Sequence, residues 1–323
     1  MDITDTLRGI DYNALDISDY SRQYIMHIIP HMDYYARIFR ATLNKLAKLS
    51  KRPLDSMTMV DYGGGHGFLS LMAKQMGAAK VIYIDNNPKA AQAVQAVAAA
   101  AGIGPDVVLT GDSDELRRWC TDSGTRPDAL VGTDVIEHIY RLEDFFADVY
   151  AVNPAMPMIF TTASNPFNPI IRKRLHKIML IAEEGDDKNE GFRRIRQRGI
   201  QEAFPNMSKD NAFVWGILTQ GLTIEDSIEM VRTKGRPPKN DGYNTCDPYT
   251  GNWTERILPI SEYRSLIAPY NASLRVSRGF YNSRQLGLKG VGLALLNAAL
   301  QLPCTVFIAP FIFLECSPQQ QKK

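Results

Sequence analysis

Residues 59–68 read Met-Val-Asp-Tyr-Gly-Gly-Gly-His-Gly-Phe, and residues 81–85 read Val-Ile-Tyr-Ile-Asp. The first stretch predicts a buried strand and a glycine turn, and the second predicts a further strand that ends in a carboxylate. Glycine has no β-carbon, so the backbone of such a turn can approach a ligand closely. Asp85 is placed to accept hydrogen bonds from two ribose hydroxyls. The pattern therefore indicates a nucleotide-type ligand site at the carboxyl edge of a parallel sheet.

The spacing of the glycines separates several classes of ligand site. A dinucleotide fingerprint reads G-x-G-x-x-G, and counting from Gly63 places Phe68 where the third glycine belongs. No Lys-Ser or Lys-Thr pair follows the glycines, which excludes a P-loop. The spacing here is Asp-x-Gly-x-Gly-x-Gly, formed by Asp61, Gly63, Gly65 and Gly67. This arrangement resembles motif I of the class I S-adenosylmethionine-dependent methyltransferases.

The resemblance implies S-adenosylmethionine as the cofactor. It implies that the glycine turn admits the methionine and ribose parts, and that Asp85 holds the ribose hydroxyls beside Asn86, a further cofactor-binding position. Asp112 follows the predicted strand 107–110 in the sequence Thr-Gly-Asp. In the family, an acidic residue there accepts a hydrogen bond from the adenine amine. The alternative is that Asp112 caps the helix predicted at 114–120.

A second informative cluster, Gly-Thr-Asp-Val-Ile-Glu-His-Ile, occupies residues 132–139. It resembles the corresponding motif of ubiquinone-type O-methyltransferases, where a Glu-His pair lies beneath the transferring methyl group. The resemblance makes Glu137 and His138 the candidate catalytic residues and Asp134 a cofactor-binding residue. His138 could act as general base, because a hydroxyl nucleophile loses its proton as it attacks. The alternative is that the pair only caps and packs a helix.

Asp134, Glu137 and His138 also offer oxygen and imidazole ligands at short helical spacing. They resemble the Glu-x-x-Glu-His group of metal-dependent small-RNA 2′-O-methyltransferases, with His176 as a remote further ligand. Arg141 replaces the next histidine of that group, which argues against RNA methylation, and we assign no metal. The formal net charge of +2 gives no global attraction to nucleic acid.

Strands and helices alternate from residue 57 to residue 162, which predicts a parallel sheet covered by helices on both faces. Two later strands, expected at 274–280 and 305–314, match the seven-stranded Rossmann-like methyltransferase sheet, whose seventh strand inserts antiparallel. We therefore expect an α/β fold in five parts. These are an N-terminal helical lid (1–50), a cofactor-binding core (51–163), an inserted, mostly helical cap (164–256), the C-terminal part of the core sheet (257–318) and a tail (319–323).

Residues 287–314 carry Lys289 as their one charged residue. The length would suffice for a bilayer span, but Pro303 and Pro310 divide the segment, and its second half is β-branched and aromatic. We expect a helix, a turn and a core strand, with peripheral membrane contact through 287–302. Scattered cysteines and the absence of a signal-peptide pattern favour a cytoplasmic protein.

The sequence thus predicts methyl transfer to a small-molecule or lipid-linked acceptor, at oxygen. The irregular polar loop at 244–253 is suited to recognising that acceptor. Two alternatives stay open, a non-catalytic binding or scaffold protein with the same fold and a metal-dependent RNA 2′-O-methyltransferase. The sequence leaves the acceptor and the oligomeric state undetermined.

Overall fold

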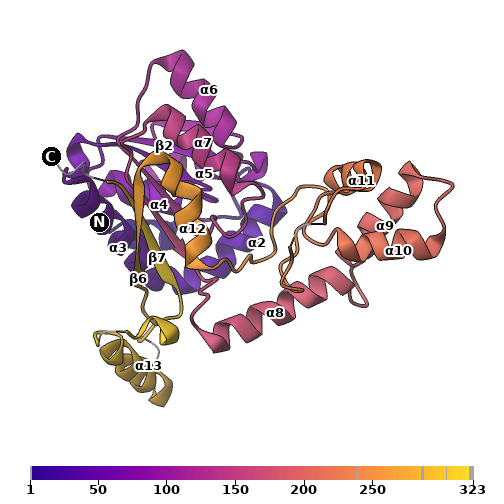
Figure 1. The fold of residues 1–323 in the computed structure, drawn as a ribbon. Helices are drawn as coiled ribbons and strands as arrows, with labels where there is room; N and C mark the ends of the chain where they lie inside the picture. The colour runs from indigo at the N-terminus through magenta and orange to yellow at the C-terminus, as the bar shows by residue number, and fades with distance from the viewer. Residues whose placement is uncertain (1, 238, 285–286, 303, 320–323) are drawn as a thin grey trace.

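The computed structural model describes residues 2–237, 239–284, 287–302 and 304–319. Within these ranges lies one seven-stranded sheet of order β3-β2-β1-β4-β5-β7-β6, with helices on both faces (Figure 1). The strands are β1 (Thr58–Tyr62), β2 (Lys80–Asp85), β3 (Val107–Thr110), β4 (Ala129–Thr133), β5 (Met158–Thr162), β6 (Ala272–Arg278) and β7 (Ile312–Pro318). The helices are α1 (Ile3–Gly9), α2 (Asp19–Ile28), α3 (Met32–Ser50), α4 (Phe68–Gln75), α5 (Pro88–Ala101), α6 (Ser113–Ser123), α7 (Leu142–Val152), α8 (Pro169–Glu184), α9 (Phe192–Ala203), α10 (Lys209–Leu218), α11 (Ile224–Thr233), α12 (Ile260–Ile267) and α13 (Leu288–Ala299).

Strands β1 to β5 pair in parallel, and β7 pairs antiparallel with both β5 and β6. The strands are buried on both sides, because successive residues enter opposite cores. Met59 and Val81 join the core under α1, α3, α4 and α5, whereas Val60 and Ile82 join the core under α6, α7 and α12. The predicted Rossmann-like, seven-stranded α/β fold with an antiparallel seventh strand is confirmed.

The predicted last strand at 305–314 is wrong in its first half. Residues Val306–Ile308 form a 3₁₀ turn, and β7 begins at Ile312. Buried asparagine side chains donate hydrogen bonds to the backbone carbonyls of this segment. Asn165 donates to the oxygens of Val306 (3.0 Å) and Ala309 (2.9 Å), so these carbonyls are not available to a strand ladder.

The N-terminal residues form the expected helices α1, α2 and α3. Pro30 splits the run, because it cannot donate a helical backbone hydrogen bond, and a 3₁₀ turn at Ile29–His31 separates α2 from α3. Side chains attach these helices to the core: Ser21 donates to the backbone oxygen of Lys89 (3.3 Å), and the Tyr34 hydroxyl donates to that of Phe280 (2.7 Å).

Helices α8 to α11 occupy the segment predicted as a cap, and they stand to one side of the sheet (Figure 1). Helix α13 projects beyond the end of the β6–β7 pair (Figure 1). Over the part of the chain that the structure describes, no helix has the length and apolarity needed to cross a membrane.

Candidate functional site

The glycine turn is fastened to strand β2. The amides of Gly63 and Gly64 donate to the Ile84 oxygen at 2.8 and 3.2 Å, and the Gly65 amide donates to Oδ2 of Asp85 at 2.9 Å. Gly65 has a φ of +53°, in the left-handed region where side chains are disfavoured. The turn and the β2 carboxylate therefore form one unit at the carboxyl edge of the sheet.

Asp61 lies underneath this turn. Its side chain is fully buried, and Oδ2 accepts a hydrogen bond from the Ser70 hydroxyl at 2.6 Å. Burial raises the pKa of Asp61 to about 7. Oδ1 has no partner among the described residues. Asp61 is not on the cavity wall described next, so in this structure it supports the turn from below.

A cavity of about 740 Å³ opens at the carboxyl edge of the sheet, within the usual size range of small-molecule sites. It gathers residues from the ends of β1 to β4. The predicted site residues on its wall are Gly63, Asp85, Asn86, Asp112, Asp134 and His138. Burial raises the pKa of Asp85 and brings that of Asp134 to about 6.

Asp112 caps a helix, which is one of the two roles that the sequence offered as alternatives. Its Oδ1 caps α6 by accepting from the amides of Asp114 (3.1 Å) and Glu115 (3.4 Å). The residue also lines the cavity next to Gly111. The helix cap therefore fixes the direction of a carboxylate that stays in reach of a ligand.

The N-terminal helices reach the glycine turn through an aromatic stack. Tyr24 of α2 lies over His66, with ring centroids 4.6 Å apart. His66 is buried, and both ring nitrogens lack a partner among the described residues. Burial lowers the pKa of His66 to about 4, so the ring is neutral at pH 7. The structure places His66 under α2.

Residues Asp134–His138 form a loop and a turn rather than a helix. Asp134 has a φ of +49°, residues 136–138 form a turn, and α7 begins only at Leu142. The Asp134 amide donates to the Thr161 oxygen of β5 at 3.0 Å. This bond directs the loop across the edge of the sheet, so its side chains are spread between cavity and core.

A segment that returns from the cap, residues 253–256, pairs with Glu137 and His138. His138 Nδ1 lies 2.7 Å from the Trp253 oxygen, and the Trp253 amide donates back to the His138 oxygen at 3.1 Å. A carbonyl can only accept, so Nδ1 carries the hydrogen and Nε2 of the neutral ring is left as the acceptor. The Arg256 amide donates to the Glu137 oxygen at 3.2 Å.

Glu137 is buried behind His138 and is not on the cavity wall. Its Oε1 accepts from the Thr162 hydroxyl at 2.7 Å, and its Oε2 has no partner among the described residues. Burial holds the pKa of Glu137 well above its ordinary value. Ligand atoms of Glu137, His138 and Glu255 lie within 4.8 Å of one another, a set of oxygen and nitrogen donors that could hold a divalent cation.

The metal alternative weighed from the sequence named a different set. Asp134 is not in the group that includes Glu255. His176, considered there as a remote ligand, instead stacks on Tyr243 with ring centroids 3.7 Å apart. Glu255 was missed because its approach depends on the path of the cap, and no spacing in the sequence reports that path.

A second cavity of about 1260 Å³ lies between the sheet edge and the cap. It shares Tyr140 and Arg141 with the wall of the first cavity. Both residues bind Asp226 of α11: the Tyr140 hydroxyl donates to its carboxylate, and Arg141 reaches it at 2.8 Å. The loop at 244–253 lies beside both cavities, with Asn252 on the first and Trp253 on the second.

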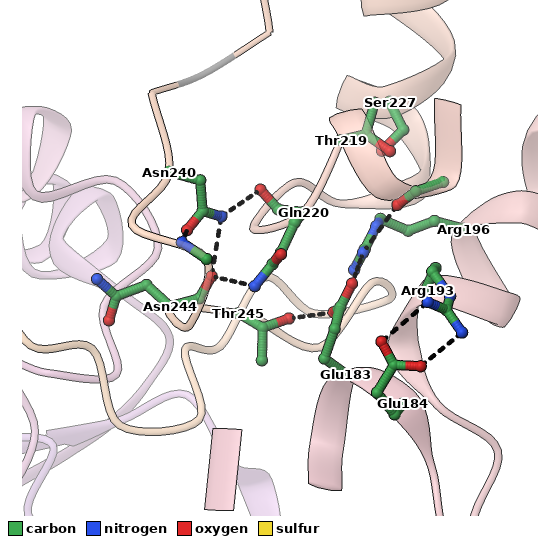
Figure 2. A network of polar contacts seen from close by, with 12 residues as sticks. Glu183, Glu184, Arg193, Arg196, Thr219, Gln220, Ser227, Asn240, Asn244 and Thr245 are labelled. Carbon is green, nitrogen blue, oxygen red and sulfur yellow. Dashed lines mark hydrogen bonds and ion pairs between the residues drawn. The ribbon is translucent and has the colours of Figure 1, made fainter. Parts of the chain in front are cut away.

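The cap has a polar interior (Figure 2). Arg196 of α9 is fully buried and pairs with Glu183 of α8, which also accepts from the Thr245 hydroxyl at 2.7 Å. The arginine-rich helix α9 is therefore not solvated all round, since Arg196 lies in the interior. Asn240 donates to the backbone oxygens of Gln220 and Asn244, both at 3.1 Å. The first of these bonds attaches the loop that follows α11 to the turn between α10 and α11.

No family model and no curated protein matches this chain. Among solved structures, it is similar to an S-adenosylmethionine-dependent methyltransferase from Mesorhizobium loti, with 14% identity over 87% of this chain and 96% of that one and a TM-score of 0.44. It is similar to the magnesium protoporphyrin IX methyltransferase from Synechocystis PCC 6803 with bound S-adenosylhomocysteine, with 14% identity, 88% and 84% coverage and a TM-score of 0.39. It also spans about half (53%) of a variant of MtNAS, with 17% identity over 50% of this chain and a TM-score of 0.34. At TM-scores below 0.5, these likenesses assign neither an activity nor a ligand to this chain.

Proposed function

We propose that this chain transfers a methyl group from S-adenosylmethionine to a hydroxyl oxygen of a small-molecule or lipid-linked acceptor. The observation that supports this most directly is the cavity of about 740 Å³ at one sheet edge, whose wall includes Gly63, His138 and the predicted carboxylates Asp85, Asp112 and Asp134. Ligands of parallel α/β sheets bind at this edge, outside the carboxyl ends of the strands.

The residues of the cavity wall and of the adjoining glycine turn fit the cofactor. A β-carbon added to Gly65 would meet no protein atom within 4 Å, so this glycine leaves space that protein packing does not need. Asp85 offers carboxylate oxygens to ribose hydroxyls, and Asp112 is available to an adenine amine. The unpartnered nitrogens of His66 lie in the turn that would enclose the methionine part. When bound, S-adenosylmethionine supplies a methyl group activated by its positively charged sulfur.

His138 is the general base of the proposal. The Trp253 carbonyl fixes its tautomer, which leaves Nε2 as the acceptor for the proton that the attacking hydroxyl loses. We assign Glu137 a positioning role, because its carboxylate binds the Thr162 hydroxyl and does not line the cavity, and its backbone oxygen accepts from the Arg256 amide. The remaining contribution is orientation of two reactants in a closed site.

The second cavity is the proposed acceptor site. It adjoins the first at Tyr140 and Arg141 and combines apolar walls, such as Ile257 and Leu258, with charged groups. A volume of about 1260 Å³ exceeds that of most small-molecule sites, which supports an acceptor with a long or bulky substituent.

Calorimetric titration with S-adenosylhomocysteine tests the cofactor part. Asp85→Asn should weaken binding by roughly 10- to 150-fold, because hydrogen bonds to a charged acceptor are worth about 1.5–3 kcal/mol. Asp122→Asn, at an exposed carboxylate near the end of α6, is the matched control and should bind as the wild type does. NADH should give no binding. Absence of S-adenosylhomocysteine binding to the wild type would reject the proposal in favour of a scaffold protein.

His138→Gln separates catalysis from cofactor binding. This variant should bind S-adenosylhomocysteine normally and lose about 10²–10⁴-fold in methyl transfer to hydroxyl acceptors, the usual contribution of a general base. The assay is release of S-adenosylhomocysteine with a panel of soluble and lipid-linked alcohols. Unchanged turnover in His138→Gln would remove His138 from the mechanism.

A further inference from the structure

Helix α13 leaves its apolar side chains uncovered. Leu288 is 91% exposed, Leu295 is 68% exposed, and Val291 lies between them at 59%. Positions 288, 291 and 295 follow one another along one helical face. Gly290 is the one residue described as buried in this helix. Apolar surface of this kind on a projecting element marks an interaction site.

Helix α8 exposes a second apolar set together with basic residues. Ile170 is 78% exposed, and Ile178, Leu180 and Ile181 are each exposed by more than two-fifths. Arg172, Lys173, Arg174 and Lys177 are exposed on the same helix, and none of the four forms an ion pair with a carboxylate within the described ranges.

Hydrogen bonds connect the residues just before α8 with the segment that follows α13. Asn165 and Asn168, immediately before α8, donate to the backbone oxygen of Ala309 in the segment that follows α13, at 2.9 and 3.0 Å. Both asparagines are buried, so this connection is part of the packed core. Figure 1 shows α8 and α13 on the same side of the molecule.

The charge of this side has one sign. Residues 169–182 contain basic residues and no Asp or Glu, and the same holds for residues 279–314, where the charged residues are Arg284 and Lys289. A surface that combines exposed Leu and Ile with unpaired Lys and Arg complements an anionic lipid surface, where apolar groups enter the acyl boundary and cations meet phosphates.

We propose that α13 and α8 dock this protein on anionic lipid bilayers, with α13 lying in the interface and the α8 basic residues on the headgroups. The docking does not require the proposed methyl transfer. It deepens that proposal in one respect, because Phe167, Arg172 and Val306 belong both to this side and to the wall of the cavity between core and cap. A lipid-linked acceptor would therefore reach the cavity from the bilayer.

Flotation of the full chain with vesicles tests the docking. The protein should float with phosphatidylcholine vesicles that contain phosphatidylglycerol, and at least tenfold less with phosphatidylcholine alone. Lys173→Gln/Lys177→Gln should lower partitioning roughly 25-fold, since each cation near an anionic surface is worth about fivefold. Leu288→Ser/Leu295→Ser should lower it at least tenfold.

Val214→Ser/Ile217→Ser on α10 is the matched control, since these side chains are 49% and 45% exposed but lie outside the proposed membrane-binding surface. It should float as the wild type does. Binding of S-adenosylhomocysteine without lipid should be the same in all variants, which verifies their folding and keeps this test separate from the proposed activity. Three results would overturn the docking: no flotation of the wild type, flotation unaffected by the α13 change, or a dimer in light scattering that Leu288→Ser/Leu295→Ser dissolves without any vesicle binding.

Discussion

Gly65→Ala isolates the part of the glycine turn that serves a ligand. Gly65 has a φ of +53°, and its added β-carbon would meet no protein atom within 4 Å. Gly77, just after α4, provides a matched control, since it has a φ of +92° and equally open surroundings but lies outside the glycine turn. Gly67 differs from both, because its β-carbon would lie 2.0 Å from Cγ2 of Val94.

These geometries give three separate magnitudes. Alanine at position 65 or 77 should cost about 1–2 kcal/mol of unfolding free energy, the cost of a left-handed conformation in a non-glycine residue. Gly67→Ala should cost several times as much, roughly 3–5 kcal/mol, because backbone strain and a packing clash act together. Affinity for S-adenosylhomocysteine should fall more than about tenfold in Gly65→Ala and stay unchanged in Gly77→Ala.

Urea unfolding without ligand gives the stabilities, and calorimetric titration gives the affinities. If Gly65→Ala bound S-adenosylhomocysteine as tightly as the wild type, the turn would not enclose the cofactor. If Gly77→Ala lost affinity to the same extent, the effect would come from general destabilisation, and the assignment of the turn would fail.

Three further changes address the base of the site, the lid and the cap. Burial raises the pKa of Asp61 to about 7, so between about pH 4 and 7 the folded state holds a proton that the unfolded chain, with its ordinary pKa of 3.8, has released. The free energy of unfolding should therefore fall as the pH rises from about 4 to 7. Asp61→Asn should flatten this slope in urea titrations. Tyr24→Leu removes the stack on His66 and should speed dissociation of S-adenosylhomocysteine roughly 2- to 10-fold in stopped-flow measurements, and an unchanged rate would contradict a lid role for α2. Glu183→Gln leaves the buried Arg196 without its ionic partner and should lower the stability of the cap by about 3–5 kcal/mol. Denaturant unfolding monitored by tryptophan fluorescence measures this loss. A loss below about 1 kcal/mol would show that water reaches this pair.

The core of the fold could be predicted from the sequence because its signals are local. Buried parallel strands read as short apolar runs, and each carboxylate at a strand end marks the same edge of the sheet. Asp85, Asp112 and Asp134 were therefore expected on one edge, and they share one cavity wall. Helix α5 begins at Pro88 after the Asn87 cap and ends at Ala101 before the Gly102 cap, which are the bounds that its start and stop signals indicate.

The remaining parts of the site depend on contacts between distant segments. The sequence offered two readings of Glu137 and His138, as catalytic residues or as residues that cap and pack a helix. In the structure they lie in a turn, held by the bond of Glu137 to Thr162 and by the segment 253–256. Their partner Trp253 is more than a hundred residues away in sequence, and no periodicity reports such a pairing. The buried state of Arg196 was hidden for the same reason, because an arginine among others on a helix reads as solvated until its carboxylate partner is located.

The pairing of Glu137–His138 with residues 253–256 gives the cap a direct part in the proposed chemistry. The carbonyl that fixes the tautomer of His138 belongs to Trp253, whose ring lines the cavity proposed for the acceptor. An acceptor that shifted this segment would therefore also change the orientation of the proposed base. Asp226 links the same region to α11 through Tyr140 and Arg141, which lie on both cavities. Acceptor recognition and proton removal are thus expected to depend on one another, because the same short stretches of backbone carry both.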